Sequence, residues 1–468
     1  MVIEVSDEFK ELVTAVESLA GMVAVEGVRG VGGKAVDYAQ VEVKIADATA
    51  AIERAAHQGL LRGLDVDEPR VKIGTERYTR VGRCEATYYT LAGPVVVERS
   101  LYRQDGHRNS RVVDAVSLRA GVVADGWLPQ TARAMAHEVQ RGTPREAEDG
   151  AAERGRLPYS RSSFDRVTHA VGELYGARND EIEDALITGY EPPAEARSVS
   201  VGLDRVAMPM AEPRPRAPGR PRRGAAKKPI TVAWRMAWVA TVTLHDKDGE
   251  ALHTIRYGAM PDDGGVSLLH GAAGDVNELL AKRPRLKVTL LSDGAHDIVD
   301  LLAVEVGGRV DRVVTQVVDF WHVVEKLAAA AALLDGDAKS RMARWRMRLL
   351  NVGHAALDIL AELRATGRED VQVGDSRPVH EAITYLDNHR GRMNYAAVRA
   401  AGLPIGSGNV EATCKTLVQV RMKRAGSRWK PETGRHVLQL RALAVSDRWG
   451  DAMKLTLQPL RKSVRVAA

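Results

Sequence analysis

Hydrophobic residues recur at helical spacing over the first 70 positions of the chain. The stretch VDYAQVEVKIADATAAIERAAHQGLLRGL places apolar side chains three or four residues apart and ends near Gly63, which predicts a helix. The pattern then changes to the shorter β rhythm of RYTRVGRCEATYYTLAGPVVVERSLYR. Its central Ala92-Gly93-Pro94 predicts a hairpin turn. We therefore expect a helical and β-hairpin region over residues 1–125.

Two short helices with capping signals are predicted within residues 126–176. In TPREAEDGAAERG, Thr143 precedes a proline and Glu146 follows three residues later, which is the pattern of a capping box. Gly155 ends this helix, and Ser160 begins the next. The outward face of that second helix carries Arg161, Arg166 and His169. Capped helices joined by a glycine turn fit a DNA-binding helix-turn-helix and an ordinary helical hairpin equally well.

An α/β rhythm begins after residues 177–196, which are acidic, contain proline and are expected to form a linker. The stretch VSVGLD has the alternating pattern of a strand and ends at Asp204. Two further strands are predicted on either side of Asp248-Gly249. Residues 211–229 lie between Asp204 and these two strands and are rich in arginine and proline, which predicts an extended loop. A helix over Val266–Lys282 and alternating strands and helices follow. A meander of three strands, followed by alternating helices and strands, is the layout of a ribonuclease-H-like α/β domain.

Three acids stand at positions where α/β folds place their sites. Asp204 is expected to end the first strand of this domain, Asp293 ends a later strand, and Glu411 opens a helix after Gly-Ser-Gly-Asn. Carboxylates are the ligands that Mg²⁺ prefers, and a pair of such ions can activate and stabilise the oxygens of a phosphodiester. Singly, each acid also fits a structural role, because Asp before Gly favours turns and Glu favours a helix start.

A cationic run follows Glu411. From Cys414 to Lys430 there are six basic residues and no acidic one. An enzyme that cuts DNA needs cations beside its carboxylates to hold the polyanion, and an aromatic side chain can stack on a base. The expected DNA-binding residues here are Lys415, Arg421, Lys423, Arg424, Arg428, Trp429 and Lys430. The alternative interpretation is a solvated helix face.

Composition narrows the class of protein. The 468 residues allow several domains, and a formal charge of +6 is too small by itself to establish a nucleic-acid partner. Two cysteines, Cys84 and Cys414, support neither a zinc site of their own nor a disulfide framework. From its first residues we expect no secretory leader. We also expect no membrane span and no P-loop, since no apolar run is long enough and GVRGVGGKA has the wrong spacing. We expect a cytoplasmic location.

Several stretches resemble bacterial insertion-sequence transposases of the ISKra group, DDE enzymes distantly akin to Mutator-like transposases. They are RSLYRQDG, SLRAGVVADGWLPQTARAMA, TPREAE, SRSSFDR, DFWHVVEKL, NHRGRMNYAAVRAAGLPIGSGNVEATCKTLV and RMKRAGSRW. The resemblance covers roughly residues 85–450, and GLPIGSGNVEATCKTL is its most specific block.

The resemblance implies a ribonuclease-H-like core with an all-helical insertion before the last acid. It implies that Asp204, Asp293 and Glu411 are the catalytic residues and hold Mg²⁺ or Mn²⁺, with two ions expected. Asp319 and His322 match the motif that follows the second Asp in the Mutator-like group, in a supporting role; a helix-start histidine bonded to the backbone is the alternative for His322. One departure is Arg205, where family members usually have Gly.

The expected division of the chain follows from these patterns. It places the core in residues 197–321 and 403–445, the helical insertion in residues 322–402, and a tail in residues 446–468. The implied activity is cleavage at the terminal inverted repeats of the element and strand transfer into target DNA, by a homodimer or larger assembly in a bacterial nucleoid. The alternatives are a decayed or domesticated transposase that only binds DNA, and a simple nuclease.

Overall fold

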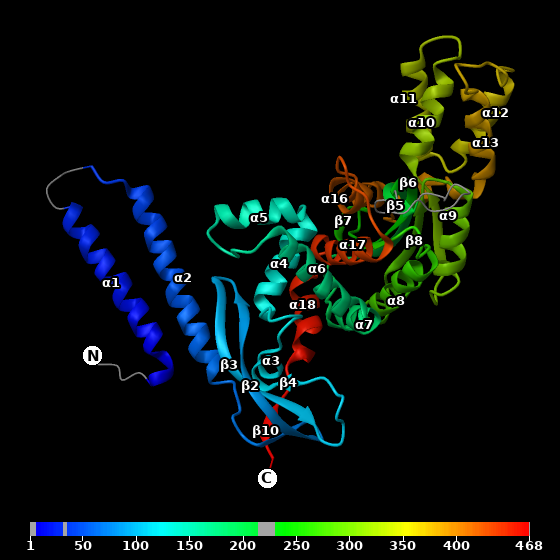
Figure 1. Ribbon diagram of the computed structural model, residues 1–468. Helices are drawn as coiled ribbons and strands as arrows, with labels where there is room; N and C mark the ends of the chain where they lie inside the picture. Colours follow the sequence, from blue (N-terminus) through cyan, green and yellow to red (C-terminus); the bar gives the residue numbers. More distant parts are fainter. Residues whose placement is uncertain (1–5, 31–34, 214–229, 468) are drawn as a thin grey trace, which may run out of the picture. The chain divides into compact units, whose positions relative to one another are not determined.

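The computed structural model describes residues 6–30, 35–213 and 230–467. The chain divides into two compact units, Met1–Ile182 with Trp449–Ala468, and Glu183–Arg448. Each unit contains helices and one five-stranded sheet. The fold is therefore a multi-unit mixture of α and β structure (Figure 1).

The first unit combines a helical hairpin, an antiparallel sheet and a group of short helices. Helices α1 (Lys10–Gly30) and α2 (Tyr38–Arg62) pack against each other, and Asp37 caps the start of α2. The sheet order is β10-β1-β2-β3-β4. The expected hairpin is confirmed, since β2 and β3 pair from Thr90↔Gly93 outward. The strands are β1 (Arg70–Ile73), β2 (Glu76–Thr90), β3 (Gly93–Gln104), β4 (Val113–Asp114) and β10 (Val464–Val466).

The capping signals of this unit are confirmed. Thr143 and Glu146 form the reciprocal bonds of a capping box at the start of α5, and the Ser160 side chain caps α6. Residues 154–160 connect the two helices, which is longer than the three- or four-residue turn of a helix-turn-helix. The helices are α1 (Lys10–Gly30), α2 (Tyr38–Arg62), α3 (Ala115–Ala120), α4 (Pro129–Arg141), α5 (Pro144–Glu153), α6 (Arg161–Gly176) and α18 (Trp449–Leu457).

The second unit is built on a mixed sheet with the order β7-β6-β5-β8-β9. Strands β5, β6 and β7 form an antiparallel meander, whereas β8 runs parallel to β5, and β9 runs parallel to β8. The expected order of three strands followed by alternating helices and strands is confirmed. The strands are β5 (Ser198–Pro213), β6 (Ile230–His245), β7 (Ala251–Ala259), β8 (Lys287–Ser292) and β9 (Val314–Val318).

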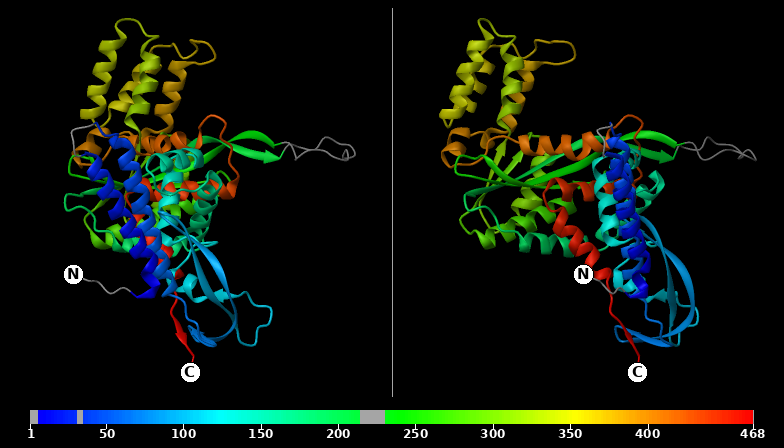
Figure 2. Two further views of the ribbon diagram at one scale, coloured as in Figure 1. Left: turned by 60° about the vertical axis from the view of Figure 1, so that its left-hand side comes forward. Right: turned by 90° about the vertical axis from the view of Figure 1, so that its left-hand side faces the viewer.

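Helices cover both faces of this sheet. On one face, apolar residues of α8 (Val266–Lys282) and of the segment after α9 (His296–Leu301) pack on β5, β6 and β8. On the other face, residues of α15 (Gly408–Thr413), α16 (Val420–Met422) and α17 (Pro431–Val445) pack on the outer halves of β5 and β6. Those outer halves continue as a two-stranded ribbon beyond the other strands (Figure 2).

A separate helical group lies between β9 and α15. Its core includes Trp345, Ile359 and Tyr395, and it joins the sheet through Leu291 and Val318. In Figure 1 the longer helices of this group lie side by side. The members are α10 (Phe320–Ala331), α11 (Ala338–Asn351), α12 (Ala355–Ala365), α13 (Pro378–Asn388) and α14 (Tyr395–Ala400).

Three sequence expectations differ from the structure. Residues 177–196, expected as a linker, contain helix α7 (Asn179–Gly189). Residues 446–468, expected as a tail, contain α18 and β10, which pairs with β1. Asp204 does not end its strand, because β5 continues to Pro213 and stays paired with β6.

The basic loop expected at 211–229 lies almost entirely outside the described residues. No helix in the described ranges has the length and apolar character needed to cross a membrane.

Candidate functional site

The strand register aligns three aspartates at one end of the second sheet. The last aligned pair between β5 and β8 is Gly202↔Leu291. Asp204 lies two residues further along β5, and Asp293 lies level with it, just after the end of β8. The last pair between β8 and β9 is Ser292↔Val318, so Asp319 follows level with Asp293. Side chains alternate along strands, and aligned residues of parallel neighbours share a face. The sheet therefore presents these acids in one row.

Glu411 reaches the same region from the helix α15, where it stands in the first turn as expected. Gly202 allows this approach, because a side chain built on it would meet Val410 of α15 at 3.2 Å and Thr241 of β6 at 3.1 Å. A π-helical segment, Cys414–Gln419, follows α15. Within it, the Cys414 thiol donates a hydrogen bond of 3.4 Å to Asp204 Oδ2.

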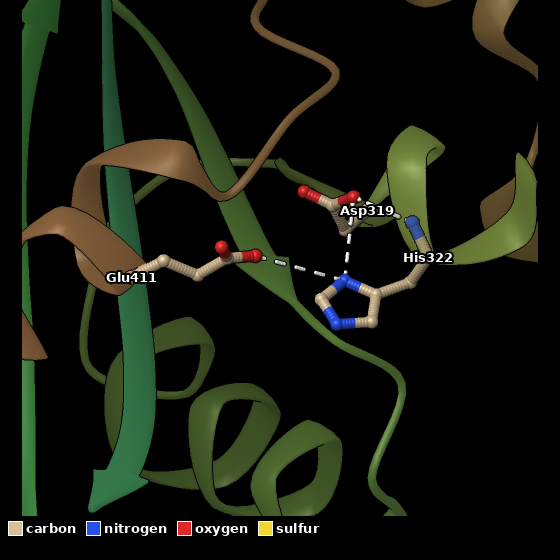
Figure 3. A group of neighbouring side chains, drawn as sticks. All are labelled: Asp319, His322 and Glu411. Atoms are coloured by element: carbon tan, nitrogen blue, oxygen red, sulfur yellow. Dashed lines mark hydrogen bonds and ion pairs between the residues drawn. The ribbon is translucent and has the colours of Figure 1, made fainter. Parts of the chain in front are cut away.

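Asp319, His322 and Glu411 place three potential ligand atoms within 4.8 Å of one another, the group with metal-ligand geometry in the described part of the chain. His322 Nδ1 lies 3.4 Å from Asp319 Oδ1 and 3.9 Å from Glu411 Oε1. Figure 3 shows the imidazole between the two carboxylates. The nearby carboxylate of Asp319, with a smaller contribution from Glu411, outweighs burial and raises the pKa of His322 to about 9.

The acceptor sites of Asp319 are all occupied by the protein. Its Oδ1 accepts hydrogen bonds from the amides of Trp321 and His322, and its Oδ2 accepts from the amide and hydroxyl of Ser407. Burial alone would raise the pKa of Asp319, but His322 and Ser407 outweigh it and lower the pKa to about 2. A carboxylate has about four lone-pair sites. Asp319 therefore joins the start of α10 to the loop before α15, and a metal ion would have to compete with these four donors for its lone pairs.

Within the described part of the chain, fewer donors reach the other three acids. The recorded donors are the Arg205 amide and Cys414 thiol on Asp204, and the Ala295 amide on Asp293. Burial raises the pKa of Asp204, and the negative charge of Asp293 adds to this effect. A cation between the two would relieve that repulsion. Carboxylate oxygens of this kind are the ligands that a hard divalent ion prefers. The structure groups Glu411 with Asp319 and His322 within 4.8 Å, and does not bring Asp204, Asp293 and Glu411 together at that distance.

Arg205 points away from Asp204. Its guanidinium forms an ion pair of 2.7 Å with Asp297 and lies 5.2 Å from the centre of the Trp238 ring. Neighbouring residues of a strand face opposite sides of the sheet. The guanidinium of Arg205 therefore lies away from the carboxylate of Asp204.

The predicted DNA-binding residues after Glu411 divide into exposed and structural ones. Lys415, Arg428 and Lys430 are exposed. Arg421 is only 3% exposed and lies 5.0 Å from the centre of the Trp429 ring, so it does not present its charge to solvent as expected.

The indole of Trp429 and two neighbouring cations are also engaged. The Trp429 indole donates to the Met422 carbonyl, and its backbone bridges to Met210 of β5. This residue joins the basic segment to the ribbon, rather than standing free to stack on a base. Lys423 lies 5.5 Å from the centre of the Trp234 ring, and the Arg424 guanidinium bonds the Val420 carbonyl.

The remaining predicted residues lie in the first unit. Arg161 and Arg166 are exposed on α6, while Phe164, Val167 and Val171 bury the opposite face. His169 is half-buried and pairs with Asp165. The predicted outward face of α6 is thus cationic at Arg161 and Arg166.

Sequence reasoning missed two residues that organise the site, Ser407 and Cys414. Ser407 stands in the quoted Gly-Ser-Gly-Asn block, where a small hydroxyl residue before a helix signals a local hydrogen bond. Its partner Asp319 is distant in sequence, so that pairing carries no local signal. Cys414 carries none either, because a buried cysteine is usually a small apolar residue.

Comparison of the chain with known protein families gave no match, and a search of curated proteins gave none either. Function therefore has to be inferred from the residues of this chain.

Proposed function

We propose that the chain is a bacterial insertion-sequence transposase of the ISKra group, with a ribonuclease-H-like core and a DDE active site. The observation that carries the proposal is the register, which places Asp204 in β5 level with Asp293 just after β8, together with the packing of the Glu411 helix, α15, against β5. The strand order of the second unit supports the same proposal, because it has the meander and parallel extension that this layout requires.

In this proposal the three carboxylates hold Mg²⁺ or Mn²⁺. A bound ion would activate water and stabilise the leaving oxygen of a phosphodiester. The protein residues hold the acids in place: the Cys414 thiol and Arg205 amide orient Asp204, and Asp319 fixes the loop that leads to Glu411 through Ser407. No covalent enzyme intermediate is required, so a serine or tyrosine nucleophile is not needed.

Exposed cations supply the binding of DNA in this proposal. Lys415, Arg428 and Lys430 follow Glu411, and Arg161 and Arg166 occupy the outward face of α6 in the other unit. Phosphate contacts of this kind provide affinity and orientation on the duplex. We propose that α4, α5 and α6 bind the terminal repeats of the element, in the role of a helix-turn-helix with a longer connection.

The alternative of a decayed, DNA-binding copy depends on Arg205. The ion pair of Arg205 with Asp297 and its stacking on Trp238 direct it away from the acids, and all three acids are retained. These observations favour the active enzyme. A simple nuclease would lack end specificity and would not need α4 to α6.

The first test examines the DNA around the reading frame. The proposal predicts inverted repeats on both sides, flanked by short direct repeats. A tagged element with these ends is then supplied with the wild-type protein or with Glu411→Gln. Strand transfer by the wild type and not by Glu411→Gln supports the proposal. Equal transfer by both proteins contradicts it, and so does a reading frame without flanking repeats.

A further inference from the structure

A cavity of about 370 Å³ opens in the first unit beside the start of α4. Segments far apart in sequence form it, from the end of α3, the first turn of α4, and α18 with the residues after it. The polar residues of its lining are Gln130, Arg133, Lys454, Gln458 and Arg461.

The cavity has three cations and no carboxylate in its lining. Lys454 and Arg461 are exposed, and Arg133 is half-buried with a contact of 3.3 Å to Gln130 Oε1. Within the described ranges, none of the three forms an ion pair. Other cations of this unit do, since Arg62 binds Glu11, and Arg156 binds Glu53. Cations of one sign that line a single hollow raise the local concentration of anions there.

Neutral donors accompany these charges. The side-chain amides of Gln130 and Gln458 line the same cavity. The first turn of α4 enters it at Pro129, and the capping residue Leu128 offers no side-chain acceptor. The positive end of a helix of this length favours anions. Cations, amides and a helix start thus face one opening.

We propose that this cavity binds backbone phosphates of a nucleic acid. The open hollow, with charges spread along its rim, suits phosphodiesters of a polymer rather than an enclosed small anion. This inference rests on the proposed function, which supplies DNA as the polyanion. It adds a contact outside the acid row and outside the outward face of α6. Phosphate contacts carry no sequence information, so this contact strengthens binding to any duplex.

The test is a salt titration of DNA binding by the full chain. The triple variant Arg133→Gln, Lys454→Gln, Arg461→Gln is compared with the wild type on a terminal-repeat duplex and on an unrelated duplex. A matched control, Lys10→Gln, Lys44→Gln, Arg62→Gln, removes the same charge from ion-paired positions outside α4 to α6. We expect the cavity variant to bind about tenfold or more weakly at 0.1 M salt, equally on both duplexes, with a log–log salt slope shallower by about 2–3. The control should keep the wild-type slope.

Several results would overturn the inference. They are an unchanged slope in the cavity variant, a loss confined to one duplex, or saturable binding of inorganic phosphate or a mononucleotide at micromolar concentration that the variant abolishes. Wild-type protein that binds neither duplex would instead contradict the proposed function itself. If the triple variant unfolds, the double variant Lys454→Glu, Arg461→Glu changes only exposed positions and allows the same comparison. We expect it to lose more DNA affinity, because each substitution reverses a charge.

Discussion

At the scale of single residues, the number of donors on each carboxylate separates the acids at the end of the sheet. Asp319 receives four hydrogen bonds within the protein, whereas one donor is recorded on Asp293 and two on Asp204. A carboxylate that is already saturated orients its donors, and one with free lone pairs can bind an ion. We therefore propose a structural role for Asp319, and propose Asp204 and Asp293 as metal ligands.

Asp319→Asn should lower the free energy of unfolding by about 3 kcal/mol, because the amide group places donors against the donors of Ser407. Asp293→Asn should change stability by less than about 1 kcal/mol, since Asp293 is half-buried. Urea unfolding measures both. Mn²⁺ binding, measured by calorimetry, should be lost in Asp293→Asn and largely kept in Asp319→Asn. The reverse pattern would make Asp319 the ligand.

Arg205→Gly restores the residue that the resembled family usually has. We expect cleavage rates within about threefold of wild type, because the exposed ion pair with Asp297 contributes about 0–1 kcal/mol and points away from Asp204. Single-turnover cleavage at saturating DNA measures the effect. A gain of a hundredfold would mean that Arg205 obstructs the site and that this copy is impaired.

The sequence predicted part of the site from local signals. Asp293 and Glu411 stand at a strand end and a helix start, and such positions are visible in a single chain. The arrangement of Arg205 and Arg421 was not predictable, because it depends on Asp297 and Trp429 meeting them in space. Charge alone therefore overstated how many cations face solvent.

At the scale of elements, helix α8 and the capped helices were predicted well, because apolar spacing and caps act over a few residues. The length of β5 was not predicted. Its outer half is held by pairing with β6 and by the bridge to Trp429, which are contacts between distant segments. The π-helical segment after Glu411 also lacked a sequence signal. It turns Cys414 toward Asp204 while Leu417 and Val418 stay in the core.

The β5–β6 pair contains a buried histidine that makes its stability depend on pH. His245 bonds Ser200 Oγ at 2.7 Å and the Gly249 carbonyl at 3.0 Å. Burial lowers the pKa of His245 to about 4. Between pH 4 and 6.5 the unfolded chain therefore binds the proton and the folded chain does not. The stabilisation is complete above pH 6.5, and falls by about 3 kcal/mol as the pH drops to 4.

The measurement is the difference in unfolding free energy between the wild type and His245→Gln from pH 4 to 7. The difference is needed because Asp275 changes the stability in the opposite direction. Burial raises the pKa of Asp275 to about 6. Its contribution to the free energy of unfolding therefore falls as the pH rises. The wild type should lose stability relative to His245→Gln as the pH decreases. A difference that does not change with pH would show that His245 is protonated in the folded protein.

At the scale of the whole molecule, the chain leaves its first unit after Ile182 and returns to it at Trp449. Within the second unit, Arg448 binds Glu183 at 2.8 Å and Asp275 at 3.2 Å. The two ends of that unit are therefore joined by one buried cation. The sequence did not predict this return of the chain, since the pairing of β10 with β1 spans almost the full length.

Arg448→Met should destabilise the second unit by about 3–5 kcal/mol, because it leaves two buried or half-buried carboxylates without their cation. Arg435→Met is the matched control, since its ion pair with Asp263 is more exposed and should contribute about 0–1 kcal/mol. Urea unfolding followed by tryptophan fluorescence, fitted with separate transitions for the two units, measures both. Equal effects of the two substitutions would contradict this role for Arg448.

The central claim is that Asp204, Asp293 and Glu411 act together on a phosphodiester. The most direct measurement is the Mg²⁺-dependent cleavage rate of a duplex carrying the terminal repeat, for the wild type and for Asp204→Asn, Asp293→Asn and Glu411→Gln. We expect each substitution to lower the rate by at least about a hundredfold, while DNA affinity stays within about threefold. Wild-type cleavage by any of the three variants would contradict it.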